Sequence, residues 1–519
     1  MGESRLKGSI TVFLSMISVL VISLICTAIE SARVQGARAQ AANIEDMGNY
    51  SVFAEYEKKL LEDYEIFAVD GSYGTGDFSI DRVNSKRNSY LTVNSEPKQE
   101  KISRLCFDPW QLQLGDSEIT EYALLTDQNG EAFYQQAVAY MKATAITGTV
   151  GKLVQYYEDA QTAEERQKSY EKVKDSSDQK MKQLEQQEAE KKKELEEQKQ
   201  QAEEQAAAGN EIVIVDETPA EIVKTENPLK VINKLRKKSL LQLVCGSREI
   251  SEKAVAWKEI ASKRSGKKGK MKLVSSYSGL TCDLFFWEYL LDRFPNYLSS
   301  EYSGKLDYQI EYILCGKRTD QENLKAVVQK LLLLREGMNY LYCAGNAEMN
   351  SQAASLAALL IGWTGIPALV TVMKHGLLLG WAYGESLLDV RTLLDGGKIP
   401  LTKTPGTWMV TLDRLGELAE LLEEGGSQRQ EGMAYKDYLR ILLNLQTITQ
   451  QKRRGLDMVE LNLQSAPGLS NFKVNNCIVG IKCRTEWRIS PVFLRVPAAF
   501  LGTSGNGWSV SGESSFAYN

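Results

Sequence analysis

The sequence has little of what enzymes use for catalysis. His375 is the only histidine, so a histidine-based triad has a single candidate base, with no cysteine or second histidine near it in sequence. No G-x-S-x-G, P-loop, H-E-x-x-H or C-x-x-C motif supplies a nucleophile, a phosphate-binding loop or paired metal ligands. Carboxylates are abundant but form no recognisable pair, which leaves a glycoside-hydrolase-like acid and base as an open alternative. We expect a non-enzymatic protein with no catalytic, cofactor-binding or metal site.

The sequence also lacks an excess of positive charge. Its net charge is -5, whereas a general nucleic-acid binder gathers a basic excess on one face. The one basic run is SKRSGKKGKMK, which contains Lys263, Arg264, Lys267, Lys268, Lys270 and Lys272. Such a run is more often a solvated loop than a surface for anionic wall polymer or lipid headgroups. We therefore expect no nucleic-acid partner.

The cysteines do not form a disulfide framework. They are scattered along the chain at Cys26, Cys106, Cys245, Cys282, Cys315, Cys343, Cys477 and Cys483. Most are expected to be reduced, buried side chains. Cys477 and Cys483 lie symmetrically about Gly480, where a hairpin turn would bring them opposite each other, so a disulfide between them is an alternative to two free thiols.

One long apolar run is present near the N-terminus. Residues Ile10 to Ile29 carry no charge, and about 20 apolar residues suffice for a helix to cross a bilayer. Arg5 and Lys7 precede the run, and no small-x-small cleavage site follows it closely, which favours an uncleaved signal anchor. Arg33 and Arg38 follow it, so the positive-inside bias is nearly even. A short N-terminal tail before a long domain favours a cytoplasmic N-terminus, with the bulk of the chain extracellular.

The anchor has a polar stripe formed by Gly8, Thr11, Ser15 and Ser18. This stripe could pack against another membrane helix. Alternatively, the hydroxyls bond back to carbonyls of their own helix. The first interpretation implies self-association through the anchor. Self-association through the charged helix described next is a separate expectation.

The predicted fold class is α+β, mostly α, in five consecutive parts. Residues 1–30 form the anchor, and residues 31–150 form a membrane-proximal α+β module. In this module a helix is expected to about Tyr64, β-prone pieces at SYLTVN and WQLQLG, and a helix near 130–145. Residues 151–209 form a charged helical spacer, residues 210–455 a helix-rich domain interrupted by a β-prone LDYQIEYILCG, and residues 456–519 a β-rich tail that contains NFKVNNCIVGIKCRTEWRI and FLRVPAAFLG.

The spacer is almost entirely Glu, Gln, Lys and Ala, with i,i+4 pairs such as Glu188 with Lys192 that support a helix. A coiled coil needs a continuous apolar seam. Here the seam that holds Leu184 and Leu195 also requires Glu188 and Lys191. A single solvated helix or a partly disordered spacer is therefore favoured over a coiled coil.

A second apolar region at residues 353–383 has two stripes of small residues. They are Ala354, Ala358, Gly362 and then Gly376, Gly380, Gly384. Such stripes let helices approach closely, in membranes and in soluble hairpins. Lys374 and His375 interrupt the apolar run, and lipid-facing helices tolerate charge poorly, so a buried helical hairpin is favoured over membrane contact.

Several segments carry a resemblance. GSITVFL at the anchor, VFAEYEKKLLEDYEIFAVDGSYG, ENLKAVVQKLLLLREGMNYLY, LIGWTGIPALV and GWAYGESLLDVRTLLDGGKIPLTKTPGTW resemble a family of Gram-positive bacterial membrane-anchored proteins known only as a domain of unknown function. The N-terminus is similar to TadE and TadG, pseudopilins of the tight-adherence pilus system. Those anchors have a glutamate between valine and phenylalanine, whereas Phe13 directly follows Val12 here, so we expect no processing after Gly8.

The resemblance implies a structural or accessory protein of a tight-adherence pilus-like assembly or secretion system. Its partners would be the membrane and other membrane subunits of that machinery. The alternative is an anchored module, enzymatic or not, that binds cell wall or an extracellular polymer; the basic run and the terminal β segment favour it.

Overall fold

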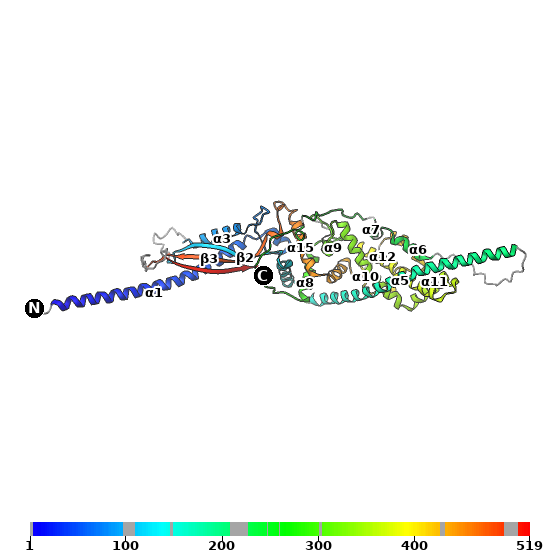
Figure 1. Ribbon diagram of the computed structural model, residues 1–519, viewed down its shortest axis with the longest axis horizontal. Coiled ribbons are helices and arrows are strands. Elements are labelled where there is room, and N and C mark those ends of the chain that lie inside the picture. The colour runs from blue at the N-terminus through cyan, green and yellow to red at the C-terminus, as the bar shows by residue number, and fades with distance from the viewer. Residues whose placement is uncertain are drawn as a thin grey trace. The chain divides into compact units, whose positions relative to one another are not determined.

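The computed structural model describes residues 4–96, 109–145, 149–207, 227–246, 248–258, 260–299, 304–425, 431–492 and 507–518. The chain divides into two compact units (Figure 1). The sheet unit comprises Met1–Tyr140, Lys258–Ser278 and Gly455–Asn519, and the helical unit comprises Met141–Trp257 and Gly279–Arg454. Both units are therefore assembled from segments that are distant in sequence, unlike the five consecutive parts expected.

The sheet unit is built around the long helix α1 (Ser4–Phe53) and an antiparallel sheet. The sheet consists of β1 (Val69–Asp70), β2 (Leu112–Leu124), β3 (Cys477–Ile489) and β4 (Trp508–Ala517). β3 is central: it pairs with β2 on one side, and with β1 and β4 on the other. The register joins Leu112 to Ile489 at one end of the β2–β3 pair and Leu124 to Ile478 at the other.

Short helices complete the sheet unit. They are α2 (Lys58–Tyr64), α3 (Ile80–Ser95), the 3-10 turns η1 (Asp127–Asn129) and η5 (Val474–Asn476), most of α4 (Glu131–Thr144), and the second half of α15 (Ile448–Leu463). Ser79 caps α3 by accepting a hydrogen bond from the Arg82 amide. Helices α1 and α3 contact each other and the sheet.

The second half of α1 packs on the sheet through one apolar face. Its buried residues Ala37, Ala41, Ile44 and Val52 recur at helical spacing. They join two clusters, one with Leu112, Trp487 and Ile489 at one end of the sheet, and the other with Leu124, Ile478 and Ile481 at the opposite end. The helix therefore runs along the sheet from one end to the other.

The helical unit has these elements: α5 (Thr149–Ala207), α6 (Pro228–Arg236), α7 (Leu240–Cys245), α8 (Leu280–Arg293), α9 (Gln309–Cys315), α10 (Asp320–Gly345), α11 (Ala347–Ile361), η2 (Gly362–Thr364), α12 (Pro367–Leu394), η3 (Pro405–Thr407), η4 (Asp413–Glu417), α13 (Leu418–Glu423), α14 (Tyr435–Asn444) and the start of α15. Its core lies where α10 and α12 pack together with α5.

Capping signals in the sequence set several of these boundaries. Thr319 and Glu322 form a capping box at the start of α10, in which each side chain accepts a hydrogen bond from the other residue's amide. Asn346 ends α10 and caps α11 through the Met349 amide. Pro367 occupies the first turn of α12, where its missing N–H costs nothing.

The fold class is confirmed as α+β and mostly α, with the helix expected near 130–145 found as α4. Two strand predictions are wrong: SYLTVN lies within α3, and residues 309–315 of LDYQIEYILCG form α9. In both places packing against neighbouring elements overrides the β propensity of aromatic and β-branched residues. FLRVPAAFLG (residues 493–502) lies outside the described residues.

The charged spacer is one helix, α5, whose first half is partly buried and whose end is mostly solvated. Leu153, Ala163, Tyr170 and Leu184 are buried within the helical unit, whereas residues beyond Leu184 are mostly exposed. On that exposed end Lys192 pairs with Glu188 at 2.7 Å. The first half of α5 is thus a core helix of its unit rather than a spacer.

Candidate functional site

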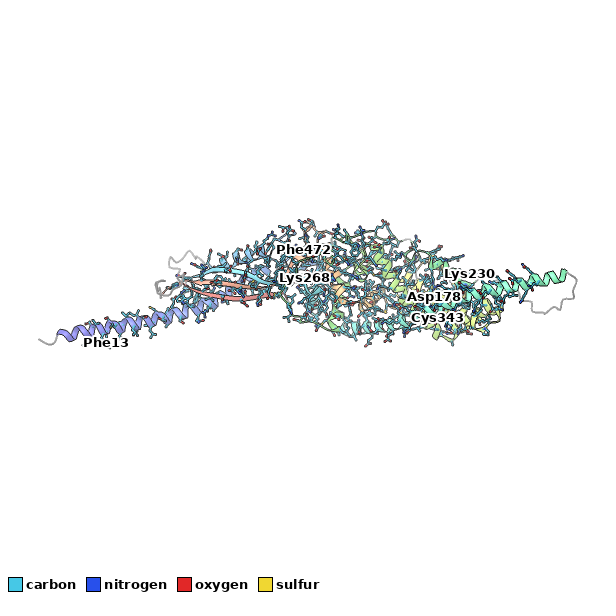
Figure 2. The ribbon with its side chains drawn as sticks, viewed as in Figure 1. Phe13, Asp178, Lys230, Lys268, Cys343 and Phe472 are labelled. Atoms are coloured by element: carbon cyan, nitrogen blue, oxygen red, sulfur yellow. The ribbon has the colours of Figure 1, made fainter. Side chains whose placement is uncertain are left out.

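The apolar segment of α1, residues 10–29, is exposed along its whole length. Val12, Phe13 and Leu20 are each at least 60% exposed, and Phe13 projects from a stretch of helix with no segment beside it (Figure 2). Of the helices in the described ranges, α1 alone is long and apolar enough to cross a membrane. In the described residues no other element packs over this stretch, whereas most apolar helices of folded domains are covered by neighbouring elements. The segment is therefore a candidate membrane anchor or signal sequence.

The apolar segment ends where α1 becomes clamped to the sheet unit. Glu30 and Arg33 are both buried and pair at 2.6 Å. The Arg33 guanidinium also donates to the carbonyls of Pro109 and Trp110 at 3.1 Å and of Ser490 at 2.6 Å. Further hydrogen bonds help to offset the cost of burying an ion pair, and these carbonyls engage both terminal nitrogens of Arg33.

A second polar network fastens α1 to α3 and the sheet. The fully buried Arg87 of α3 donates to Asn49 of α1 at 2.7 Å, to Ser117 of β2 at 2.7 Å and to Thr485 of β3 at 3.0 Å. Burial lowers the pKa of Arg87. One side chain thereby joins four elements.

Glu45 of α1 lies close to this network. It accepts a hydrogen bond from the Trp487 indole at 2.9 Å, and burial raises its pKa. The helix that carries the apolar segment is therefore held to its domain by buried polar bonds as well as by apolar packing. Neither network was expected from the sequence, since the first joins three distant segments and the second joins four.

The predicted polar stripe lies on α1. Gly8 is within the helix, and Thr11, Ser15 and Ser18 are exposed. The Ser15 hydroxyl donates to the Val12 carbonyl at 2.8 Å, and Thr27 donates to Ser23 in the same way. Both hydroxyls thus bond to carbonyls of their own helix; Ser15 belongs to the predicted stripe, and Thr27 does not.

The small-residue stripes of the second apolar region differ from each other. Gly376, Gly380 and Gly384 are buried on α12, and a Cβ on Gly380 would lie 2.6 Å from Leu229 Cδ2. On α11 the buried residues include Ala353, Ala357 and Ile361.

The predicted α11 stripe is one residue out of register, because Ala354 is half-buried while Ala358 and Gly362 are exposed. A shift of one residue turns a helix face by about 100°, so this stripe faces away from the helices that α11 packs against. His375, in the following helix, is exposed, and desolvation together with Lys374 and Lys180 lowers its pKa.

The alternative of a hairpin turn at Gly480 with a Cys477–Cys483 disulfide is not found. Both thiols are free, and β3 passes straight through Gly480. Six residues of extended strand separate their Cα atoms by roughly 20 Å, beyond the ~7 Å that a disulfide spans. Burial raises the pKa of Cys483 to about 11, so its thiol is protonated at neutral pH.

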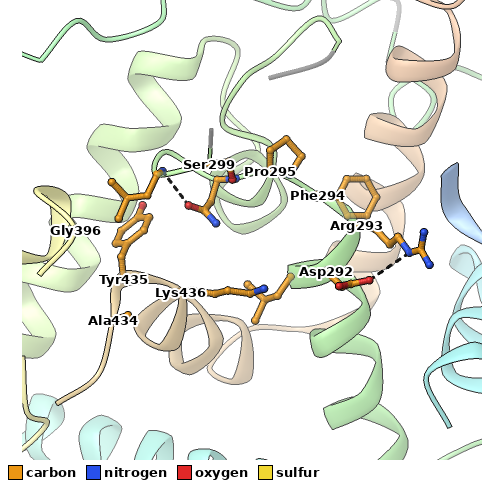
Figure 3. A pocket seen from close by; sticks show the side chains of 12 residues that line it. Asp292, Arg293, Phe294, Pro295, Ser299, Gly396, Ala434, Tyr435 and Lys436 are labelled. Carbon is orange, nitrogen blue, oxygen red and sulfur yellow. Dashed lines mark hydrogen bonds and ion pairs between the residues drawn. The ribbon is translucent and has the colours of Figure 1, made fainter. Parts of the chain in front are cut away.

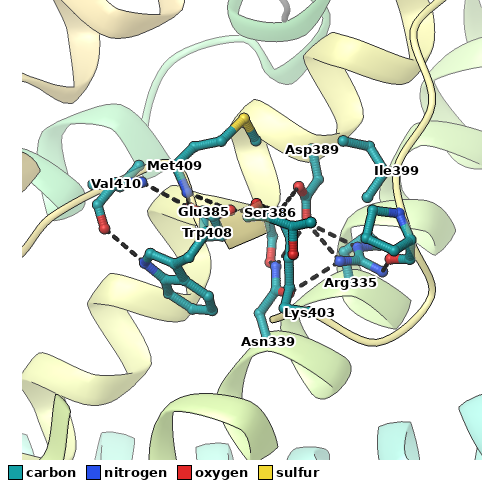
Figure 4. Close-up of polar contacts among 12 residues, drawn as sticks. Arg335, Asn339, Glu385, Ser386, Asp389, Ile399, Lys403, Trp408, Met409 and Val410 are labelled. Carbon is teal, nitrogen blue, oxygen red and sulfur yellow. Dashed lines mark hydrogen bonds and ion pairs between the residues drawn. The ribbon is translucent and has the colours of Figure 1, made fainter. Parts of the chain in front are cut away.

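The helical unit contains a buried ion cluster that consists of Arg335, Glu385, Asp389 and Lys403 (Figure 4). Lys403 pairs with Glu385 at 2.5 Å and with Asp389 at 2.6 Å, and Arg335 pairs with Asp389 at 2.8 Å. Two cations balance two anions. Burial would raise the pKa of Asp389, but Arg335 and Lys403 outweigh burial and hold it below its usual value.

The cluster binds backbone as well as charge. Arg335 donates to the carbonyls of Pro400 and Leu401, and Glu385 accepts from the amides of Met409 and Val410. These bonds fix the irregular segment 399–410 onto α10 and α12. Each charge of the cluster is thus engaged by another protein group. The cluster therefore stabilises the fold of the helical unit.

A surface pocket of the helical unit is lined by residues 291–296, 298, 299, 396 and 434–436 (Figure 3). Its side chains include Asp292, Arg293, Tyr435 and Lys436, so the lining contains one carboxylate. The Tyr435 hydroxyl donates to the fully buried Glu311 at 2.8 Å. Burial raises the pKa of Glu311 to about 7.

Among the described residues, no group of three or more His, Cys, Asp or Glu side chains is placed to hold a metal ion. No curated protein and no solved structure matches the chain. A family model does match residues 218–489, a range that includes most of the helical unit and strand β3. The chain belongs to this family, which is the family of unknown function DUF5702.

Proposed function

We propose that this protein is a membrane-anchored, outward-facing structural or accessory subunit of a tight-adherence pilus-like assembly or secretion system. The observation that carries the proposal is the division of α1 into two halves. Its first half is apolar and exposed, and its second half is packed on an antiparallel sheet without a break in the helix. A subunit built in this way presents a folded domain at a fixed distance from the membrane that holds its helix.

The clamp at Glu30 and Arg33 supports an outward orientation. Arg33 is neutralised by Glu30 and is buried against the sheet unit, which leaves Arg38 as the exposed cation that follows the apolar segment closely. Arg5 and Lys7 precede the segment. Two cations thus precede the apolar segment, and one exposed cation follows it closely. Under the positive-inside rule this difference favours a cytoplasmic N-terminus.

The rigid connection of α1 to its domain supports a structural role. Because Arg87 and Glu45 bind α1 to α3, β2 and β3, force or displacement applied to the apolar segment is transmitted directly to the sheet. An enzyme tethered for localisation alone would need no such connection. The exposed faces of the apolar segment would contact anchors of neighbouring subunits.

Orientation is tested by thiol labelling in intact cells. A variant with its native cysteines replaced carries Ala189→Cys on the exposed end of α5, and a second variant carries Leu184→Cys at a buried position of the same helix. We expect an impermeant maleimide to label the Ala189→Cys variant without lysis and the Leu184→Cys variant only after denaturation. Labelling of Ala189→Cys only after lysis places the body in the cytoplasm and refutes the proposal.

Participation in filaments is tested by deletion and complementation. We expect deletion of the gene to abolish surface filaments and adhesion, and the full-length chain to restore both. A chain without residues 1–29 should fold but fail to complement. Filaments and adhesion that are unchanged in the deletion strain, while the pilus genes are expressed, would exclude this function.

A further inference from the structure

The basic run forms an extended strap across the sheet unit. From Lys268 to Val274 exposed and half-buried residues alternate, with Gly269, Met271 and Leu273 turned toward the unit and Lys268, Lys270 and Lys272 exposed. Alternation with a period of two is the geometry of an extended chain. We call these three lysines the lysine row; Lys268 is marked in Figure 2.

The strap is held in place along its length. The Gly269 amide donates to Asp127 at 3.0 Å, and the Met271 amide donates to the Tyr122 carbonyl at 3.1 Å. A Cβ on Gly269 would collide with that same carbonyl, so only glycine allows the strap to lie this close.

Both ends of the strap are also fixed. On one side Arg264 makes a bidentate pair with Glu460 at 2.8 Å, and on the other Gln135 exchanges two hydrogen bonds of 2.7 Å with the Tyr277 backbone. The backbone that carries the lysine row is therefore held in place along the strap and at both of its ends.

The spacing of the row suits a repeating anion. Alternate residues of an extended chain are roughly 6.8 Å apart, which is about twice the ~3.4 Å that separates phosphates along one nucleic-acid strand. Three ammonium groups in line can thus meet every second phosphate of a linear polymer. Asp127, the carboxylate that attracts Lys268, is engaged by the Leu124 and Gly269 amides, and burial raises its pKa.

The row lies far from the apolar segment within the same unit. The clamp at Arg33 contacts the end of the sheet near Trp110 and Ser490, whereas the strap contacts Tyr122 at the opposite end. From Ile29 to Phe53 α1 rises roughly 35 Å. Charges are screened over about 8 Å at physiological salt, so headgroups of the membrane that holds α1 are beyond the reach of the row.

We propose that Lys268, Lys270 and Lys272 bind a linear phosphate-bearing polymer along its backbone. The strap segment SGKKGKMKLV contains no aromatic residue on which a base could stack. Binding therefore depends on phosphate spacing and charge rather than on nucleobases. This binding site goes beyond the proposed function and does not depend on filament assembly.

The test uses the full chain in nanodiscs of zwitterionic phosphatidylcholine, with fluorescent long-chain polyphosphate as the probe. Affinity is measured as a function of NaCl concentration for the wild type, for K268Q/K270Q/K272Q, and for the control K191Q/K192Q/K193Q. The control removes the same charge from the exposed end of α5. Circular dichroism verifies that each variant is folded.

With three phosphate contacts, log K of the wild type and the control should fall with log salt at a slope of roughly -2. The K268Q/K270Q/K272Q variant should lose this slope and bind at least about tenfold more weakly at low salt. Equal binding by this variant and the wild type, or an equal loss in the control, overturns the proposal. So does tighter binding of single-stranded DNA of equal charge, or row-dependent capture on phosphatidylglycerol vesicles without binding of polyphosphate.

Discussion

Removing the Lys403 ammonium should destabilise the helical unit more than most single changes. Lys403 pairs with Glu385 at 2.5 Å and with Asp389 at 2.6 Å, and it donates to the Thr407 carbonyl at 3.0 Å. Lys403→Met keeps most of the side-chain volume but leaves two buried carboxylates facing one cation, Arg335. Breaking a buried ion pair by removing one partner costs about 3 to 5 kcal/mol.

Charge balance can be restored without restoring the lysine. In the double variant E385Q/K403M, Arg335 and Asp389 still form a neutral pair. Residue 385 can still accept a hydrogen bond from the Met409 or Val410 amide, although one acceptor oxygen is lost. We therefore expect the double variant to be more stable than Lys403→Met by about 1 to 2 kcal/mol, which is a positive coupling between adjacent sites.

Hydrogen exchange measured by mass spectrometry is the appropriate assay, because a chain with two units need not unfold in one step. Peptides that cover residues 399–410 and α12 report the helical unit, and peptides from β3 serve as an internal control. Protection of 399–410 that is unchanged in Lys403→Met would refute a fastening role for the cluster. A double variant less stable than the single one would refute the charge-balance argument.

Three further outcomes follow from buried groups. Arg87→Met should cost about 3 kcal/mol in the sheet unit, measured as faster exchange in peptides from α1 and α3, because three buried hydrogen-bonding partners lose their donor. Gly380→Ala should cost up to about 1 kcal/mol in thermal melts, because its Cβ meets the end of the Leu229 side chain at 2.6 Å and that side chain must shift, whereas Gly362→Ala enters open space and should change stability little. The pKa of Glu311 is raised by burial from 4.5 to about 7, so the folded state binds a proton that the unfolded state has lost. The free energy of unfolding of the helical unit, measured by urea titration, should therefore fall as the pH rises between these two pKa values. Glu311→Gln should remove this part of the pH dependence.

Each of these outcomes has a clear contradiction. Exchange in α1 that is unaffected by Arg87→Met would mean that apolar packing alone holds the helix. If Gly380→Ala and Gly362→Ala change stability equally, close approach of another helix at Gly380 is not what makes this glycine important. A Glu311→Gln variant with the same pH dependence as the wild type would show that another group titrates in this range.

Some features follow from local sequence alone. The uncharged stretch from residue 10 to residue 29 predicts an exposed apolar helix because length and composition suffice for that conclusion. Thr319 with Glu322 marks the start of α10 through a capping box within four residues. Gly376, Gly380 and Gly384 are spaced four residues apart, so the helical period alone places them on one face of α12.

Other features could not be predicted because their members are distant in sequence. Glu385 and Asp389 stand one turn apart on an otherwise apolar stretch of α12, a signal that buried partners exist, but nothing local identifies Arg335 and Lys403 as those partners. Arg87 likewise looks like any helical arginine until β2, β3 and α1 surround it. The lysine row was visible as a basic run, but its fixed spacing depends on Asp127 and Tyr122.

The sequence by itself determined the apolar segment, the mostly α composition and the buried glycine face of α12, since each depends on residues within a few helical turns. Tertiary structure alone decided the position of β3 between strands drawn from both ends of the chain, the two free thiols on that strand, and the pairing of buried charges. Pairing of strands and charges depends on contacts that close long loops, and the free energy of those contacts comes from burial, which no local pattern records.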